Sequence, residues 1–409
     1  MRPLGGMPGN TGCNRGAGAL TASWQGDRVG ANGKSGGKPD KARRRHGWPL
    51  RRPPRQKNEG ASASAAGHEP LPLPAAVRQA GEQPEAAIYG ALDLGTNNCR
   101  LLLARPSATA AGFEVVDAYS RIVRLGEGVL STGRLSDEAV DRTIKALRVC
   151  SNKLKWWNVR RARLIATEAC RMASNGGEFI SRVKDELGLE LEIIDRETEA
   201  NLAAAGASPL ICGEARTVLV FDIGGGSTEI LWLNVSKGRY RIGDWTSLPA
   251  GVVTVAERFG GKTVSADNFA AMREHVHGLA RPFADRLMNG RSAASLPDHL
   301  LGTSGTVTTV CGIHLNLRRY DRARVDGSWI NGSDVARVTQ ELLSMSYEER
   351  AASPCVGPER ADLVLAGCAI LEEIRAIWPA ERIRVADRGL REGILTSLMM
   401  EDGYDGRTA

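Results

Sequence analysis

The sequence predicts an α/β protein with two similar halves, each built on a mixed β-sheet flanked by helices. Three observations support this prediction. Apolar segments with strand character alternate with helical segments along most of the chain. A strand–turn–strand unit occurs twice, at 88–104 and at 217–233. The 409 residues are 42% hydrophobic, which is enough for a large core and for two domains.

The first 85 residues are predicted to form a disordered basic tail. They carry 14 Lys and Arg against 6 Asp and Glu, whereas the whole chain has a net charge of +7, so the rest is close to neutral. The tail has few β-branched and aromatic residues, so it cannot bury enough apolar surface to offset the entropy of ordering. The basic run Lys41–Lys57 either belongs to a solvated tail with no specific ligand or binds a polyanion by charge. A third interpretation is that the true start codon lies further downstream and the tail is not made. Nucleic-acid binding is not expected for the near-neutral body.

The first domain is expected to span 86–212 and to open with the hairpin at 88–104. Ser136 is a plausible N-cap for the helix that follows the third strand, because the apolar residues after it recur with helical spacing. The expected elements are a strand at 112–126, a helix at 136–157, a strand at 161–167, a helix at 177–187, a strand at 189–195 and a helix at 197–207.

The second domain is expected to span 213–402, followed by a short tail at 403–409. It opens with the hairpin at 217–233 and repeats the alternation of the first domain. The expected elements are a strand at 245–251, a helix at 265–288, a strand at 299–305, helices up to 343, a helix at 360–378, a strand at 382–387 and a closing helix at 389–400.

The two hairpin turns carry residues suited to a phosphate and a metal ion. Asp93 and Asp222 hold the same place in the two hairpins, 129 residues apart. Glycine takes left-handed backbone angles without a Cβ clash, which would let backbone N–H groups converge on an anion. An aspartate beside a phosphate needs a cation between them, and Mg²⁺ or another divalent cation fits. Two such hairpins predict a metal–phosphate clamp in the cleft between the domains.

Three further features have both a structural and a functional interpretation. Glu229 is either a solvent-facing strand residue or a carboxylate that reaches the same metal or water. Arg171 is either a surface arginine or a ligand-binding residue close to a strand end. The third turn, "LLGTSGTVTTV", either contacts a nucleoside or distant phosphate, or is a helix start capped by Thr303 or Thr306.

Further blocks make the chain resemble a known family. "ATEACRMASNG", "IIDRETEANLAAAGA", "VFDIGGGSTEI", "LPAGVVTVAERF" and "DRGLREGIL" occur in that order. Together with the hairpins they resemble the exopolyphosphatase and guanosine pentaphosphate phosphatase family, over about 88–400. This resemblance implies two ribonuclease-H-like domains of the actin-like ATPase superfamily, with the active site in the interdomain cleft.

The resemblance also implies roles for individual residues. Glu199 matches the family's catalytic glutamate, Glu229 its second catalytic and metal-side glutamate, and Asp93 and Asp222 its metal-side aspartates. The implied substrate- or phosphate-binding residues are Thr96, Asn97, Asn98, Arg100, Arg171, Gly224, Gly225, Gly226, Ser227 and Thr228. The implied reaction is metal-assisted attack of a water, activated by Glu199, on a terminal phosphoanhydride.

The sequence departs from the family in two places. Asn201 stands where many members carry Arg, so one basic contact is missing. The chain resembles the short, two-domain form of the family, so the helical module that follows "DRGLREGIL" in longer members is not expected, and chain-length preference and processivity stay open.

Several functions stay open at this point. The predicted function is release of terminal orthophosphate from inorganic polyphosphate, with the 5′-γ-phosphate of guanosine pentaphosphate as a second substrate. The alternative within this class is a guanosine pentaphosphate phosphatase with little polyphosphate activity. An ATP-dependent small-molecule kinase and a non-catalytic, nucleotide-gated scaffold are alternatives of other classes. We could identify neither the adenine pocket nor the acceptor aspartate that the kinase would need.

The sequence predicts a soluble, cytoplasmic protein that binds no membrane. The N-terminus has no apolar signal-peptide core, and no apolar run approaches the roughly 18 residues of a membrane helix. The scattered cysteines, without a CxxC pair, do not predict a zinc site. A homodimer is left open.

Overall fold

The structure, a computed structural model, describes residues 87–108, 112–237, 239–289 and 296–404. The basic tail predicted for 1–85 lies outside these residues. Within them, no helix combines the length and apolar character needed to cross a bilayer.

The first sheet has five strands and is mixed, as predicted. Their spatial order is β3 (Phe113–Ile122), β2 (Asn98–Pro106), β1 (Tyr89–Leu94), β4 (Arg161–Ala166) and β5 (Glu192–Ile193). β1, β2 and β3 are antiparallel, whereas β4 pairs parallel to β1 and β5 pairs parallel to β4. The predicted strand at 189–195 is therefore reduced to two residues.

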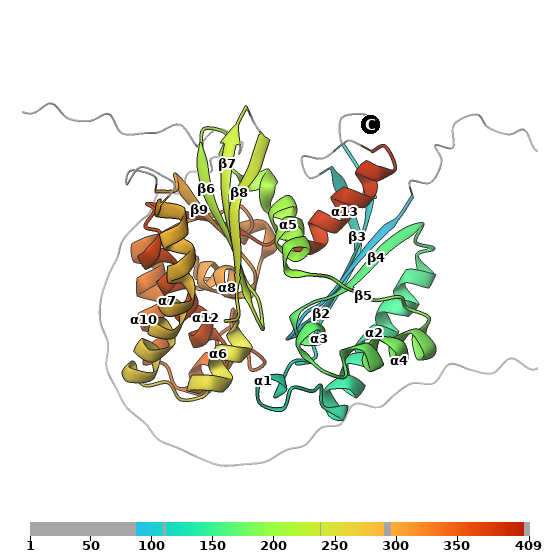
Figure 1. Ribbon diagram of the computed structural model, residues 1–409, viewed down its shortest axis with the longest axis horizontal. Coiled ribbons are helices and arrows are strands. Elements are labelled where there is room, and N and C mark those ends of the chain that lie inside the picture. The colour runs from blue at the N-terminus through green and yellow to red at the C-terminus, as the bar shows by residue number, and fades with distance from the viewer. Residues whose placement is uncertain (1–86, 109–111, 238, 290–295, 405–409) are drawn as a thin grey trace, which may run out of the picture. The chain divides into compact units, whose positions relative to one another are not determined.

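Helices cover both faces of the first sheet (Figure 1). On one face, α2 (Asp137–Trp156) and α4 (Gly176–Leu187) bury an apolar cluster with β1 and β2. Ser136 is the N-cap of α2, as predicted, and its hydroxyl accepts a hydrogen bond from the backbone N–H of Ala139. The short helices α1 (Val129–Thr132) and α3 (Glu168–Met172) follow β3 and β4.

The second sheet repeats this pattern with one more strand. Its spatial order is β10 (Trp329–Asn331), β11 (Arg382–Ala386), β9 (His299–Thr303), β6 (Thr217–Ile223), β7 (Thr228–Ser236) and β8 (Arg239–Leu248). β6, β7 and β8 are antiparallel, and β9 and β11 continue parallel to β6. The two halves of the chain thus share one architecture, and the α/β fold is confirmed.

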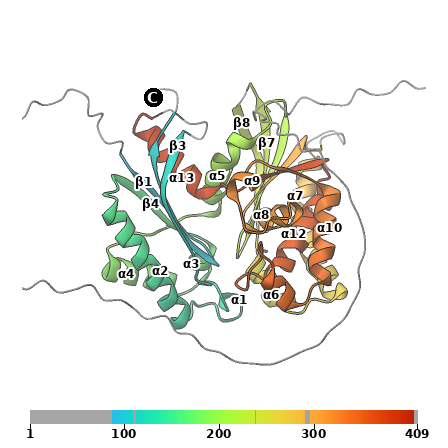
Figure 2. The same ribbon diagram turned by 180° about the vertical axis from the view of Figure 1, so that it is seen from behind.

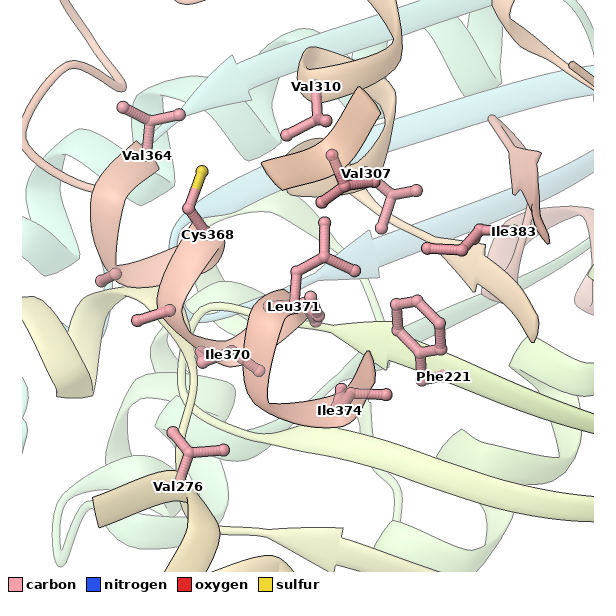
Figure 3. Packing of buried hydrophobic residues seen from close by; sticks show 14 of the residues in the cluster. Phe221, Val276, Val307, Val310, Val364, Cys368, Ile370, Leu371, Ile374 and Ile383 are labelled. Atoms are coloured by element: carbon pink, nitrogen blue, oxygen red, sulfur yellow. The ribbon is translucent and has the colours of Figure 1, made fainter. Parts of the chain in front are cut away.

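One face of the second sheet is covered by the largest apolar cluster among the described residues. The long helices there are α7 (Ala266–Asn289), α8 (Gly305–His314), α10 (Gly332–Ser344) and α12 (Val364–Ile377). Figure 3 shows Leu371 and Ile374 of α12 on the side of Phe221 of β6, with Leu371 also near Val307 of α8. The remaining short elements are α6 (Val252–Phe259), α9 (Arg322–Val325), α11 (Tyr347–Ala352) and the 3₁₀ helix η1 (Ser208–Leu210).

Helix α5 (Arg196–Ala207) contacts the second sheet and shares an apolar cluster with the first, and α13 (Leu390–Glu401) packs against it (Figure 2). The two helices approach closely because glycines face the partner backbone. A Cβ at Gly206 would lie 1.8 Å from the carbonyl oxygen of Gly389, and one at Gly393 would lie 2.1 Å from that of Leu202. The C-terminal helix therefore lies on the first sheet, although it follows the second sheet in the sequence.

Strand alternation brings four charged residues to the faces that α5 and α13 cover. Successive strand residues point to opposite faces, so residues two positions apart lie on the same face of the sheet. Ala91 and Leu102 pack with α13, which puts Asp93 and Arg100 on that face. Val220 and Leu231 pack with α5, and Asp222 and Glu229 follow the same alternation.

Candidate active site

The two hairpin turns have the same geometry. In the first, the N–H of Gly95 donates to the carbonyl of Asn98, and Asp93 lies opposite Arg100. In the second, the N–H of Gly224 donates to the carbonyl of Ser227, and Asp222 lies opposite Glu229. Every pair of equivalent positions is separated by the same 129 residues. The repeated unit seen in the sequence is therefore a repeated backbone structure.

The glycines of the second turn are needed for close approach. A Cβ at Gly225 would lie 2.9 Å from the Cβ of Thr96, and one at Gly226 would lie 2.8 Å from the hydroxyl of Thr96. A Cβ at Gly251 would lie 2.4 Å from the carbonyl carbon of Gly225. Left-handed backbone angles were predicted as the reason for glycine in the two turns. This prediction is wrong, because the glycines of neither turn have a positive φ. The tips of the two hairpins pack directly against each other.

A pocket of about 120 Å³ is lined by residues of both hairpins and of α5. Most of the predicted site residues line it, namely Asp93, Thr96, Asn97, Asn98, Arg100, Glu199, Asp222, Gly224, Gly225, Gly226, Ser227 and Glu229. Thr228 does not, because its hydroxyl is buried and donates a 2.6 Å hydrogen bond to the carbonyl of Ala250. Arg171 is not among the lining residues either.

Five carboxyl groups line this pocket, and the pKa values of four of them, Asp93, Glu199, Asp222 and Glu229, are raised. Burial, followed by the charges of Glu199 and Asp93, raises the pKa of Asp222 to about 7. Burial and the charge of Asp222 raise the pKa of Glu229 to about 7. Burial also raises the pKa of Asp93, against the opposing effect of Arg100. The repulsion among these groups favours a cation or a shared proton in the pocket.

Glu229 is held in place by two serines. Ser227 and Ser247 each donate a hydrogen bond to Oε1 of Glu229, at 2.8 and 2.9 Å. The side chain is only 2% exposed, so the solvent-facing interpretation of Glu229 is wrong.

Glu199 reaches the pocket from the first turn of α5. The helix begins after Asp195, whose carboxylate accepts a 2.7 Å hydrogen bond from the N–H of Thr198. Burial and the charge of Glu229 raise the pKa of Glu199 to about 8, although Arg171 opposes this shift. A raised pKa makes the ionised carboxylate a stronger proton acceptor than an ordinary one, and a cation bound nearby would favour that ionised form.

Arg171 contacts Glu199 from behind the pocket wall. Its Nη2 donates a 2.8 Å hydrogen bond to Oε2 of Glu199, and its Nη1 donates one of 2.6 Å to the carbonyl of Ile194. Nε and Nη2 also donate to the carboxylate of Glu168. The guanidinium of Arg171, which was predicted to bind phosphate, therefore binds the carboxylates of Glu168 and Glu199.

The third turn belongs to the same pocket. Ser304, Gly305 and Thr306 line it, together with Thr309 of α8. Capping by Thr303 or Thr306 is not observed, because the N-cap of α8 is Ser304, and its hydroxyl donates to the carbonyl of Ile223. Ser304 has a φ of 87°, a left-handed value that costs energy for a residue with a Cβ.

A second cavity of about 450 Å³ adjoins the pocket and shares Asp93, Arg100 and Asp222 with it. Five arginines line it, namely Arg100, Arg322, Arg360, Arg388 and Arg391. Arg322 is paired with Glu392, and Arg388 is paired with Asp326. Within the described residues, the other three make no side-chain hydrogen bond or ion pair. The pocket therefore continues into a cavity lined by both arginines and carboxylates, in which three of the arginines form no ion pair within the described residues.

Comparison with known proteins agrees with this arrangement. A family model described as the Ppx/GppA phosphatase family matches residues 105–402. The chain belongs to this family. A curated Ppx/GppA-type relative is "Exopolyphosphatase 2" of Mycobacterium tuberculosis, which is 31% identical over 320 residues, covering 75% of this chain and 97% of the relative.

Solved Ppx/GppA structures share the fold. The crystal structure of the Aquifex aeolicus family member has a TM-score of 0.64 and 29% identity, covering 78% of this chain and 99% of that one. An exopolyphosphatase from Cytophaga hutchinsonii has a TM-score of 0.69 and 25% identity, with the same coverage. The predicted resemblance to this family is therefore confirmed.

Only some of the carboxylates predicted as metal ligands in this Ppx/GppA chain are placed to bind a divalent cation. Among the described residues, no group of three His, Cys, Asp or Glu side chains is suited to hold a metal ion. The predicted ligand set Asp93, Asp222 and Glu229 is thus not a closed cluster, since Glu229 is bound by two serines. Mg²⁺ often uses one or two carboxylates and completes its shell with water and phosphate oxygens. Asp93 and Asp222, which form no side-chain hydrogen bond within the described residues, fit such a site.

Sequence reasoning missed two residues of this pocket, Glu168 and Arg360. Glu168 lies three positions before Arg171 on α3, an acid–base spacing that could have indicated an ion pair. Arg360 precedes α12, and nothing in its local sequence shows that it reaches a turn more than fifty positions earlier.

Proposed function

We propose that this protein releases orthophosphate from the end of inorganic polyphosphate by metal-assisted hydrolysis, with Glu199 as the base. The observation that supports this most is the position of Glu199, beside Glu229 and between two glycine turns whose pocket continues into an arginine-lined cavity. The name of the Mycobacterium tuberculosis relative supports the same reaction.

Glu199 would orient the attacking water and accept its proton. Arg171 fixes one carboxylate oxygen of Glu199. The other is not engaged by any described residue, so it is free to bind the water. Phosphoryl transfer depends on positioning and on charge neutralisation more than on covalent chemistry, so a well-held water is the main requirement.

The turns and the cation would hold the terminal phosphate. The N–H groups of Gly95 and Gly224 are used within the turns, so the donors and positive charge at the pocket wall would come from the other turn residues and from the side chain of Arg100. When bound beside Asp93 and Asp222, a divalent cation would neutralise charge on the phosphate oxygens. The aspartates would then face the cation and not the phosphate itself.

The adjoining cavity favours a long anionic substrate. Arg100, Arg360 and Arg391 form no side-chain hydrogen bond or ion pair within the described residues, so their N–H groups can bind phosphate oxygens. Phosphates behind the terminal one would follow the cavity past these arginines.

Guanosine pentaphosphate is a second candidate substrate. The turn at Ser304–Thr306 lines the pocket and offers hydroxyl and backbone groups that a nucleoside could contact. Both substrates present a terminal anhydride to the same carboxylates, so the pocket supports both.

The test is phosphate release from long-chain polyphosphate in the presence of Mg²⁺, with guanosine pentaphosphate and ATP in parallel. We expect release from polyphosphate by the wild-type protein and its loss in Glu199→Ala. Release from guanosine pentaphosphate alone would change the substrate but keep the mechanism. No release from either, with ATP consumed when a sugar is added, would replace the hydrolase by a kinase.

A further inference from the structure

The carboxylate of Glu168 is buried among charged groups that the proposed reaction does not yet explain. It is 2% exposed, begins α3, and lines the same pocket as Glu199. Burying a carboxylate is costly unless it is paired and hydrogen-bonded, and Glu168 is both. We propose that Glu168 is a positioning residue, which fixes Arg171 so that Arg171 holds the catalytic carboxylate of Glu199. This inference rests on the proposed function.

Two arginines bind Glu168 through four hydrogen bonds. Arg171 donates from Nε at 3.0 Å and from Nη2 at 2.6 Å, both to Oε2. Arg196 donates from Nη2 to Oε1 at 2.6 Å and from Nε to Oε2 at 3.2 Å. Burial would raise the pKa of Glu168, but these bonds hold it below its usual value. Glu168 is therefore ionised and rigidly placed.

Arg171 has little freedom left to act on a substrate. A guanidinium has five N–H donors, and four of them are used here. Besides the two bonds to Glu168, Nη1 donates to the carbonyl of Ile194 and Nη2 donates to Oε2 of Glu199. The guanidinium of Arg171 is thus held by three partners, and one of them is Glu199, the proposed base.

The stem of Glu168 is fixed as well. A Cβ at Gly226 would lie 3.0 Å from Cγ of Glu168, so this side chain packs against the glycine turn of the second hairpin. Direct binding of substrate by Glu168 is unfavourable, since a carboxylate repels phosphate. The charge of Glu168 instead compensates part of the positive charge of Arg171 and Arg196 beside the pocket.

The test compares kcat and KM for polyphosphate in the wild type, Glu168→Gln, Arg171→Met and the double variant. Misplacing a base typically costs about 10–100-fold in rate, so Glu168→Gln should lower kcat by that factor and leave KM near the wild-type value. If Glu168 acts through Arg171, the double variant should be no slower than Arg171→Met alone. Glu192→Gln, which removes an exposed partner of Arg163, is the matched control and should keep wild-type kcat.

Two outcomes would overturn the inference. One is a folded Glu168→Gln protein with wild-type kcat. The other is a double variant in which the two losses multiply, which would give Glu168 a role independent of Arg171. If Glu168→Gln does not fold, Glu168→Asp decides, because it keeps the charge but shortens the reach to Arg171, and the same loss of kcat is expected. An inactive wild-type protein would instead refute the proposed function, and the wild-type assay separates the two failures.

Discussion

Nη2 of Arg171 donates a hydrogen bond of 2.8 Å to Oε2 of Glu199. Both side chains are mostly buried, so the bond is protected from competing water. Charge-assisted hydrogen bonds of this kind are stronger and more directional than neutral ones. The bond fixes the carboxylate plane of Glu199 and leaves its other oxygen for a reaction partner.

Replacing Glu199 by Gln should abolish most of the hydrolysis while keeping the fold. The amide can still accept a hydrogen bond from Arg171 but cannot take up a proton, so kcat should fall by about 10²–10⁴-fold. Glu197→Gln, an exposed residue in the same first turn of α5, is the matched control and should stay fully active. Phosphate release under saturating polyphosphate measures both, and equal rates for the two variants would refute the role of Glu199.

The stability of the cation-free protein should fall as pH rises from about 4.5 to about 8. The pKa values of Asp222 and Glu229 are raised from 3.8 and 4.5 to about 7, and that of Glu199 is raised from 4.5 to about 8. In this window these three groups hold more protons in the folded protein than in the unfolded chain, so their contribution to stability falls with each pH increase. Removing the Asp222 charge should reverse part of this loss.

Asp222→Asn should therefore raise the free energy of unfolding at pH 8 by about 1–3 kcal/mol and change little at pH 5. The exposed Asp185→Asn should show no such pH dependence. Thermal melts at the two pH values, with and without Mg²⁺, test this. Mg²⁺ should stabilise the wild type more at pH 8 than at pH 5, and a cation effect equal at both values would contradict the site.

Gly251→Ala should destabilise the pocket. Its Cβ would lie 2.4 Å from the carbonyl carbon of Gly225, so the second turn must move. Overpacking of this kind typically costs about 1–3 kcal/mol. Gly177→Ala is the control, because nothing lies within 4 Å of its Cβ position and alanine favours the helix. Urea unfolding should separate the two, and a wild-type midpoint for Gly251→Ala would refute the close contact.

Arg360→Gln should weaken the binding of long polyphosphate more than that of tripolyphosphate. The side chain lines both the pocket and the arginine-lined cavity, so a longer chain has more phosphates that can reach it. KM measured over a series of chain lengths, with the exposed Arg182→Gln as control, tests this. An equal rise of KM at all lengths would place the effect on the terminal phosphate alone.

Local patterns in the sequence predicted the features that are set locally. Both hairpins, with Asp93 and Asp222 at the same register, follow from strand alternation and turn residues. The N-cap at Ser136 and the helix that carries Glu199 follow from their own residues. The role of Glu199, however, came from the family resemblance, because its local sequence fits an ordinary helix start.

The remaining features depend on contacts between distant segments. The glycines of the second turn are required by Thr96, which lies more than a hundred positions earlier, so the local explanation by backbone angles failed. Arg360 likewise reaches the third turn from a distant segment, so its local sequence did not indicate this position. Glu168 could be placed only once α3 and α5 were seen side by side, since its partner Arg196 belongs to the other helix.

The equivalent positions opposite the two aspartates carry opposite charges, with Arg100 in the first hairpin and Glu229 in the second. A gene duplication that yields two identical hairpins would give a symmetric pocket with no preferred direction for a ligand. This difference, one of several between the two hairpins, gives the pocket a positive and a negative side. A phosphate that binds together with a cation is therefore oriented by these two residues. Its negative end lies on the side of Arg100 on β2, and the cation lies on the side of Glu229 on β7.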